Sequence, residues 1–315
     1  MAPRLTFCVP TYEGAAFLPR TLASLLAVRG DAEGGASAIE IVVGDDASTD
    51  GSADLAREIA AKDAESHPGG GSARIAVHAF RDNLGLAGNW NRTLRLARGE
   101  FVCLFGQDDL ARPDFAERLV GLLARHPECG MAFGAREFHV ADEESRQVVG
   151  DFFERRYPEM MRPFNERLAR LAQSPSSDEV IAPEVLIDEA LRFQFEINLI
   201  GEPSFVVMRR GHPALAAGFD EQMQQMVDWE LWTRFFAAGP IARTPEIVGT
   251  YHVHARGSSM KNARLSRHYR EFDHLLGVTL ARFAGRLTGE QVGALEARRT
   301  EVQRLAIEHA AKEKA

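Results

Sequence analysis

Short apolar segments alternate with helix-like segments along the first third of the chain, and this alternation constrains the fold more than any other feature. Between the apolar runs, apolar residues recur at helical spacing. Strands that are apolar on both faces are typical of a parallel sheet that helices cover on both sides. We therefore predict an α/β fold whose ligand binds beyond the carboxyl ends of the strands. The predicted strands are 5–9, 39–43, 75–80 and 101–105, and the predicted helices are 17–26, 52–62 and 89–97.

The second half of the chain alternates less regularly. A proline at the start favours a helix over 113–125, and 151–173 remains unassigned before a polar break at 174–178. Beyond Met260 the residues are almost all helix formers. One apolar stripe there is expected to pack on the body of the protein or on a second copy: Phe272, Leu276, Leu280, Phe283 and Leu287. The other predictions in this half are strands at 131–140 and 205–208 and helices at 183–195 and 229–237.

Charge and cysteine content exclude several classes of protein. With 37 basic and 45 acidic side chains, the formal net charge is −8, whereas nucleic-acid binding needs a basic face that displaces counterions. We therefore expect no nucleic-acid partner. No apolar run approaches the ~20 residues of a membrane helix, and the N-terminus lacks the pattern of a signal peptide. Three cysteines are too few and odd in number for a disulfide framework, so we expect a reducing, cytoplasmic location.

Polar residues follow three of the predicted strands directly. The first strand leads into residues 10–13, the second into Asp45 and Asp46, and the fourth into Asp108 and Asp109. In a parallel sheet these ends meet at one edge. There Tyr12 could stack on a nucleobase, and a carboxylate could accept from base or ribose donors. The alternatives are an ordinary turn aromatic at Tyr12 and a helix cap at Asp45–Asp46.

Asp108 and Asp109 suggest a cation site. Adjacent carboxylates repel one another unless a cation lies between them, and Mg²⁺ typically takes one or two carboxylates together with substrate phosphates. The alternative is a solvated loop, or a cap for the helix at Pro113.

Together these motifs resemble those of a family 2 glycosyltransferase with the GT-A fold, a Rossmann-like nucleotide-binding sheet. The resemblance is dense over 4–115 and returns at 201–204, 227–232 and 251–254. It implies a nucleotide-sugar-binding half at 1–112 and an acceptor-binding, catalytic half of the same domain at 113–260. A C-terminal helical extension follows at 261–315.

The resemblance also implies roles for individual residues. The nucleoside pocket would be lined by Pro10, Thr11, Tyr12 and Glu13. Asp46 would hold the base or ribose, beneath a closing segment that contains Asn83 and Asn91. Asp108 would lie near the ribose and metal, Asp109 would bind Mn²⁺ or Mg²⁺ at the donor diphosphate, and His254 would lie near both. Asp228 would be the catalytic base.

The sequence departs from the family pattern at two positions. Gln107 replaces the first carboxylate of the commoner Asp-x-Asp motif, which weakens the case for a metal without removing it. Val227 stands where another acidic residue often precedes the base, so Asp228 would act alone. Asp228 could instead be a plain helix cap. A divalent cation stabilises a leaving diphosphate as a Lewis acid, and one base with in-line attack implies inversion at the anomeric carbon.

The implied function is an inverting glycosyltransferase that moves a sugar from a nucleoside-diphosphate sugar to an acceptor hydroxyl, in assembly of bacterial cell-surface polysaccharide or glycolipid. The acceptor would be a saccharide or a lipid-linked saccharide, with peripheral contact at the inner face of the membrane. The C-terminal helices could join two copies. The basic run Arg256–Arg270 would face diphosphate, acidic lipid or solvent.

Three alternatives remain at this point. A catalytically impaired, glycosyltransferase-like binding protein would account for Gln107. A sugar-phosphate nucleotidyltransferase would favour a Gly-rich loop with Arg or Lys after the first strand, which 10–14 does not provide. A receiver-like signalling domain would need a Lys on a following strand, and there is none between Lys62 and Lys261.

Overall fold

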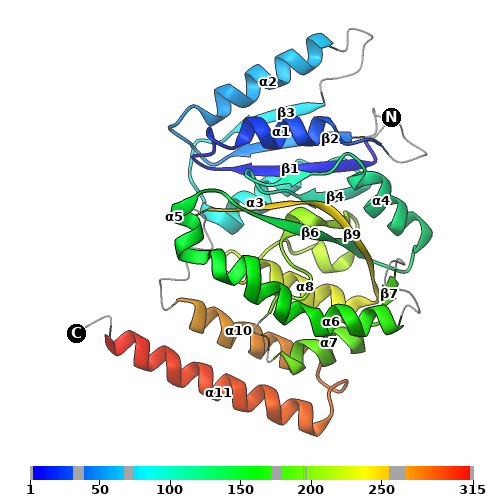
Figure 1. The fold of residues 1–315 in the computed structure, drawn as a ribbon, viewed down its shortest axis with the longest axis vertical. Coiled ribbons are helices and arrows are strands. Elements are labelled where there is room, and N and C mark those ends of the chain that lie inside the picture. Colours follow the sequence, from blue (N-terminus) through cyan, green and yellow to red (C-terminus); the bar gives the residue numbers. More distant parts are fainter. Residues whose placement is uncertain are drawn as a thin grey trace.

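A computed structural model of the protein describes residues 3–30, 39–66, 74–171, 179–193, 195, 197–254 and 267–312. Its first half is a parallel sheet in the order β3-β2-β1-β4, whose strands follow one another from top to bottom in the upper part of Figure 1. The prediction of an α/β fold with parallel strands is confirmed. The strands are β1 (Leu5–Thr11), β2 (Ile39–Asp45), β3 (Ile75–Ala79) and β4 (Phe101–Leu104).

Alternate residues of β1 explain why the strands are apolar throughout. Phe7 and Val9 pack on one face of the sheet in a core that includes residues of α1 and α4, whereas Cys8 belongs to the core on the other face, with Ala87 of α3. Side chains alternate across a strand, so burial on both faces requires a continuous apolar run. The helices of this half are α1 (Leu18–Leu26), α2 (Ser52–Ser66), α3 (Gly85–Arg95) and α4 (Phe115–Arg125).

The second half extends the same sheet. β8 (Val206–Arg209) lies antiparallel between β4 and β6 (Met131–Val140), and β9 (Ile241–Val253) runs parallel to β6. Two short strands, β5 (Leu110–Ala111) and β7 (Glu179–Ile181), pair antiparallel with β9. The predicted strands at 131–140 and 205–208 are therefore present, and the two halves share one continuous sheet.

A long helical segment crosses the region that the sequence left unassigned. α5 (Glu143–Ser145), the π-helical segment η2 (Arg146–Arg156) and α6 (Tyr157–Leu171) follow one another without a break. The later elements are α7 (Pro183–Arg192), the short 3₁₀ turns η3 (Pro203–Phe205) and η4 (Pro213–Leu215), and α8 (Val227–Ala238). The predicted polar break at 174–178 and most of the basic run Arg256–Arg270 lie outside the described residues.

The C-terminal helices α10 (Arg267–Arg282) and α11 (Gly289–Lys312) lie at the end of the molecule opposite α2 (Figure 1). The predicted apolar stripe packs on the body of the protein, because Phe272, Leu276 and Phe283 share a core with Leu231 and Trp232 of α8. Within the described part of the chain, no helix is both long and apolar enough to cross a membrane.

Candidate active site

The carboxyl ends of β1, β2 and β4 meet at one edge of the sheet. Thr11 pairs with Asp45 across β1 and β2, and its carbonyl accepts a hydrogen bond from the Asp46 backbone N–H at 2.8 Å. The loop after β4 reaches the same edge, since the Gln107 side chain contacts the backbone of Tyr12. The three polar clusters therefore converge as the strand order predicts.

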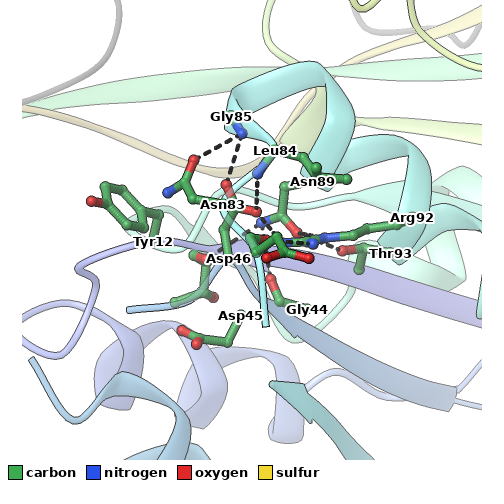
Figure 2. Close-up of polar contacts among 12 residues, drawn as sticks. Tyr12, Gly44, Asp45, Asp46, Asn83, Leu84, Gly85, Asn89, Arg92 and Thr93 are labelled. Carbon is green, nitrogen blue, oxygen red and sulfur yellow. Dashed lines mark hydrogen bonds and ion pairs between the residues drawn. The ribbon is translucent and has the colours of Figure 1, made fainter. Parts of the chain in front are cut away.

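Tyr12 presents an open aromatic surface on a fixed backbone. The residue is 52% exposed, and its ring lies apart from the hydrogen-bonded network in Figure 2. Gln107 Oε1 accepts from the Tyr12 N–H at 3.0 Å, and Gln107 Nε2 donates to the Tyr12 carbonyl at 3.2 Å. A carboxylate at 107 could accept but could not donate. Glycine at 14 leaves room for this amide, because a Cβ there would lie 2.2 Å from Gln107 Oε1 and displace it.

Glu13 joins the loop after β1 to the loop after β2. One carboxylate oxygen accepts from the Thr49 N–H at 2.7 Å and from the Thr49 hydroxyl at 3.0 Å. The Glu13 N–H in turn donates to the Ser48 hydroxyl at 3.0 Å. Glu13 therefore holds these two loops against one another. Pro10 and buried Thr11 belong to the end of β1 itself.

Asp46 anchors the segment that was expected to close over the base. Its carboxylate accepts from the backbone N–H groups of Leu84 and Gly85, each at 3.0 Å, and forms an ion pair with Arg92 (Figure 2). The Asn83 side chain accepts from the same Gly85 N–H at 2.9 Å. Both oxygens of the Asp46 carboxylate are therefore hydrogen-bonded within the protein. Its contacts therefore favour the fixing of α3 and its preceding loop over direct contact with a ribose.

Asn91 lies elsewhere. Its side-chain amide donates to the Phe219 carbonyl and to the Glu221 carboxylate, both at 2.9 Å, and its oxygen accepts from the Phe219 N–H at 2.7 Å. These contacts favour a role in joining α3 to the second half of the chain over the expected role in nucleotide binding. Asn89, two residues earlier, donates to the carbonyls of Thr11 and Gly44 and so ties the ends of β1 and β2 together.

Asp45 carries an unsatisfied acceptor. One carboxylate oxygen accepts from the Ser48 N–H at 3.1 Å. The other is buried and has no hydrogen-bond partner among the described residues. An unpaired buried acceptor costs about 1–3 kcal/mol, so this oxygen is suited to a donor that a ligand supplies. The sequence placed Asp45 in the polar cluster but assigned the ligand contact to Asp46.

The acidic pair after β4 divides into a buried and an accessible carboxylate. Asp109 is buried, and its oxygens accept from the His252 N–H at 3.0 Å and from the Ser204 hydroxyl at 2.5 Å. Burial and the adjacent Asp108 charge hold the pKa of Asp109 well above its usual range. Asp108 is partly exposed, and its Oδ2 lies 2.8 Å from His254 Nε2. Asp109 therefore fixes the loop after β4 to Ser204 and to the backbone of β9.

Asp108 and His254 fit a divalent cation that has open coordination positions. A carboxylate oxygen and an imidazole nitrogen converge at the site edge, and Phe17 stacks on the His254 ring at a centroid distance of 4.5 Å. Among the described residues, no cluster of three or more His, Cys, Asp or Glu side chains could enclose a metal ion. Diphosphate oxygens and water would complete such a shell, as they commonly do for Mg²⁺.

Asp228 lies at the start of α8. The N-cap residue of this helix is Met226, so Asp228 lies within the first turn and is not its N-cap. Asn198 Nδ2 donates to Asp228 Oδ2 at 2.8 Å. Burial, and then the neighbouring Glu202 carboxylate, raise the pKa of Asp228 to about 7. A carboxyl with this pKa can act as a general base near neutral pH.

The segment 201–204 connects the two carboxylate sites. Ser204 donates a hydrogen bond to Asp109. Glu202 forms an ion pair with Arg136 of β6 at 2.8 Å, and its charge raises the pKa of Asp228. Gly201 has φ +95°, and a Cβ there would lie 2.3 Å from the Arg136 guanidinium. Glycine at this position therefore permits the close packing that places Glu202.

Residues 6–181, more than half of the chain, match the family model described as Glycosyl transferase family 2. The chain belongs to this family. It is 28% identical over 243 residues to an uncharacterized protein, MT1568, of Mycobacterium tuberculosis, covering 77% of this chain and 65% of that protein. It is 26% identical over 265 residues to the succinoglycan biosynthesis protein ExoO of Rhizobium meliloti, covering 84% of this chain and 64% of that protein. The chain thus spans less than two thirds of either relative.

Solved structures of GT-A glycosyltransferases share the fold. The S. aureus TarS 1–349 complex with UDP-GlcNAc superposes with a TM-score of 0.59 at 15% identity, covering 95% of this chain and 71% of that one. The mannosyltransferase PcManGT from Pyrobaculum calidifontis, in complex with GDP-Man and Mn²⁺, gives 0.57 at 20% identity, covering 100% and 80%. Membership of a glycosyltransferase family argues against the nucleotidyltransferase and receiver alternatives.

The segment that matches the family model contains only part of the candidate site. The matched segment contains Tyr12, Asp45 and Asp108, whereas Asp228 and His254 lie beyond residue 181. Sequence reasoning missed the positioning roles of Gln107, Asn198, Ser204 and Arg136. Ser204 and Gln107 lie within recognised motifs, but no local signal in the sequence identified Asn198 or Arg136.

Proposed function

We propose that this protein is a metal-dependent, inverting glycosyltransferase that moves a sugar from a nucleoside-diphosphate sugar to an acceptor hydroxyl. The observation that carries the proposal is the arrangement around 201–204. This segment holds the Asp108–Asp109 loop through Ser204 and adjoins Asp228 through Glu202. The Asp108–Asp109 loop and the Asp228 carboxyl, whose pKa is about 7, therefore lie on either side of one short segment, an arrangement that supports their roles as diphosphate site and base.

The donor nucleoside would bind at the ends of β1 and β2. Tyr12 offers an exposed ring for stacking on the base, and stacking of this kind is worth about 1–3 kcal/mol in nucleic-acid complexes. The unpaired Asp45 oxygen would accept from a base N–H or a ribose hydroxyl. The floor formed by Pro10, Thr11 and Glu13 and the loop 83–85 would enclose the nucleoside.

Asp108 and His254 would hold Mn²⁺ or Mg²⁺ against the donor diphosphate. A bound divalent cation supplies Lewis-acid stabilisation of the departing diphosphate. The chain's own contribution is to fix the two ligating side chains. Asp109 holds the loop through Ser204 and the β9 backbone, and Phe17 fixes the plane of the His254 ring.

Asp228 would accept the proton of the acceptor hydroxyl as the acceptor oxygen bonds to the anomeric carbon and the bond from that carbon to the diphosphate oxygen breaks. Attack from the side opposite the leaving group inverts the anomeric centre. Asn198 orients the carboxylate by its hydrogen bond to Oδ2. A positioned general base contributes about 10²–10⁴-fold to the rate.

One relative is a succinoglycan biosynthesis protein, which supports a place in polysaccharide or glycolipid assembly. The acceptor we propose is a saccharide or lipid-linked saccharide, used in the cytoplasm at the inner face of the membrane. Neighbouring structures contain UDP-GlcNAc and GDP-Man, so UDP- and GDP-sugars are the first donors to test.

The test measures release of nucleoside diphosphate from UDP-, GDP- and TDP-sugars with Mn²⁺, with and without saccharide acceptors. Asp228→Asn should bind the donor as wild type does and transfer sugar at least ~10²-fold more slowly, because the amide cannot take the proton. An Asp228→Asn variant with normal transfer would show that this residue is not the base. A wild-type protein that bound donors but never turned them over would be a catalytically impaired relative.

A further inference from the structure

The helix that carries Asp228 is held along its length by α10, which lies outside the segment that matches the family model. Arg282 of α10 donates to Glu230 Oε1 at 2.8 Å. Arg286, just beyond α10, donates to the Ala237 carbonyl near the end of α8 at 2.9 Å. Figure 1 shows α10 between α8 and α11. The C-terminal part of the chain is therefore joined to α8 by polar contacts as well as by the shared apolar core.

Glu271 of α10 holds the segment that leads into α8. Its Oε1 accepts from the Gln224 N–H at 3.0 Å, and its Oε2 accepts from the N–H groups of Gln225 and Met226 at 2.8 and 3.0 Å. Glu271 is itself buried. Hydrogen bonds to an ionised acceptor are about twice as strong as neutral ones, so three of them to one carboxylate fix this segment firmly.

Glu271 supplements the capping of α8, in which the Asp228 carboxyl accepts from the N–H groups of Asp228 and Trp229. The N-cap residue Met226 provides no side-chain hydrogen bond, and the first N–H groups of a helix have no partner within it. A negative charge near the first turn also favours the helix through its dipole. Glu271 supplies a charge, and an acceptor for the Met226 N–H, from another helix.

Asp228 lies two residues beyond the last amide that Glu271 holds. The path of 224–226 therefore sets where the first turn of α8 begins and where the Asp228 carboxylate points. A general base must come within about 2.6–3.2 Å of the proton that it takes. A displacement of about 1 Å can lower a rate by about 10²-fold.

We propose that Glu271 is a positioning residue for glycosyl transfer: it fixes the start of α8 and, through it, the place of Asp228. This proposal rests on the proposed function, in which Asp228 is the general base. It makes α10 part of the catalytic unit, although the family match ends at residue 181.

The test compares Glu271→Ala and Glu271→Gln with a matched control, Asp273→Asn. Asp273 also lies on α10, but its carboxylate accepts from Arg299 and Gln303 of α11. Hydrogen exchange of the 224–226 amides should be at least ~10-fold faster in Glu271→Ala and unchanged in Asp273→Asn, because protection follows the local hydrogen bonds.

Transfer kinetics with the full chain provide the second readout. In Glu271→Ala, kcat should fall at least ~10-fold while nucleoside-diphosphate affinity stays at the wild-type value. The kcat of Glu271→Gln should lie between those of the wild type and Glu271→Ala, because the glutamine amide oxygen still accepts from the backbone. Asp273→Asn should keep the wild-type kcat even where its thermal stability falls, since a merely structural contact does not act on the base.

The outcomes separate this proposal from the proposed function. An active wild-type protein whose Glu271 variants keep kcat, or keep slow exchange at 224–226, would overturn this proposal alone. Should Glu271→Ala unfold, Glu271→Gln decides the matter at a temperature where it remains folded. A wild-type protein that transfers no sugar from any donor would overturn the proposed function and this proposal with it.

Discussion

The rate of sugar transfer should depend on pH through the ionisation of Asp228. Burial and the Glu202 carboxylate raise the pKa of Asp228 to about 7. With that pKa, about 9% of the protein has an ionised Asp228 at pH 6 and about 91% at pH 8. Only the ionised carboxylate can accept the acceptor proton, so kcat/KM should rise about tenfold between these two pH values.

Replacement of Glu202 by glutamine tests the cause of this pKa. The Glu202 charge favours the protonated form of Asp228, so Glu202→Gln should lower the pKa and move the acid limb to lower pH. A decrease of one unit would make about half of the Asp228 side chains ionised at pH 6, about five times the wild-type fraction. Glu128→Gln is the control, because Glu128 is an exposed glutamate that lies just before the first residue of β6.

The assay is the initial rate of donor turnover across pH 5.5–8.5, with donor affinity measured calorimetrically at each pH. Normalisation by affinity separates the base from the nucleotide site. A rate that stays flat over this range would refute the role of Asp228. An acid limb that moves to higher pH in Glu202→Gln would refute the electrostatic explanation.

Three further substitutions test separate parts of the site. Gln107→Glu removes the donor to the Tyr12 carbonyl, a hydrogen bond worth about 0.5–1.5 kcal/mol. Calorimetry should therefore show about two- to tenfold weaker binding of nucleoside diphosphate. An unchanged affinity would contradict the role of Gln107 in holding Tyr12. Asp108→Asn should abolish the part of that affinity which EDTA removes from the wild type, and an EDTA-insensitive wild type would argue against a metal at Asp108 and His254. Because the Asp228 pKa is about 7 when folded and about 3.9 when unfolded, wild-type stability falls as pH rises from about 4 to 7. Asp228→Asn should therefore raise Tm at pH 8 and leave it unchanged at pH 4.

The first half of the fold could be predicted because its strands are buried on both faces. Continuous apolar runs identified β1, β2, β3 and β4 to within about two residues. β9 was not predicted as a strand. It contains Pro245 and polar residues, and its pairing with β6 has register shifts near Gly134 and Ala135. Such a strand shows no clean period in the sequence.

The starts of α3 and α8 illustrate why the roles of site residues could not be predicted fully. Neither helix has a side-chain cap from its own N-cap residue. Asp46 from β2 holds the first amides of α3, and Glu271 from α10 holds the amides before α8. Contacts over 38 to 47 residues of sequence leave no local pattern. The sequence therefore identified Asp46 as a site residue but assigned it to the ligand.

The acidic pair shows the same limit at closer range. Two adjacent carboxylates indicated a cation, yet the sequence could not tell which one the fold would bury. The hydrogen bonds of Asp109 to Ser204 and to the β9 backbone turn it inward and leave Asp108 beside His254. Gln107 was likewise interpreted as the loss of a metal-ligating carboxylate, whereas its amide makes two hydrogen bonds to the Tyr12 backbone.

The stereochemistry of donor hydrolysis tests most directly whether a single carboxylate base and in-line attack operate at this edge of the sheet. The wild-type protein would be incubated with Mn²⁺ and the donor that it binds, and proton NMR would follow the first-formed free sugar before mutarotation. Inversion predicts the anomer opposite to that of the donor, with Asp228→Asn reducing its formation at least ~10²-fold. Release of the same anomer as in the donor, or equal rates in the variant, would contradict the proposed function.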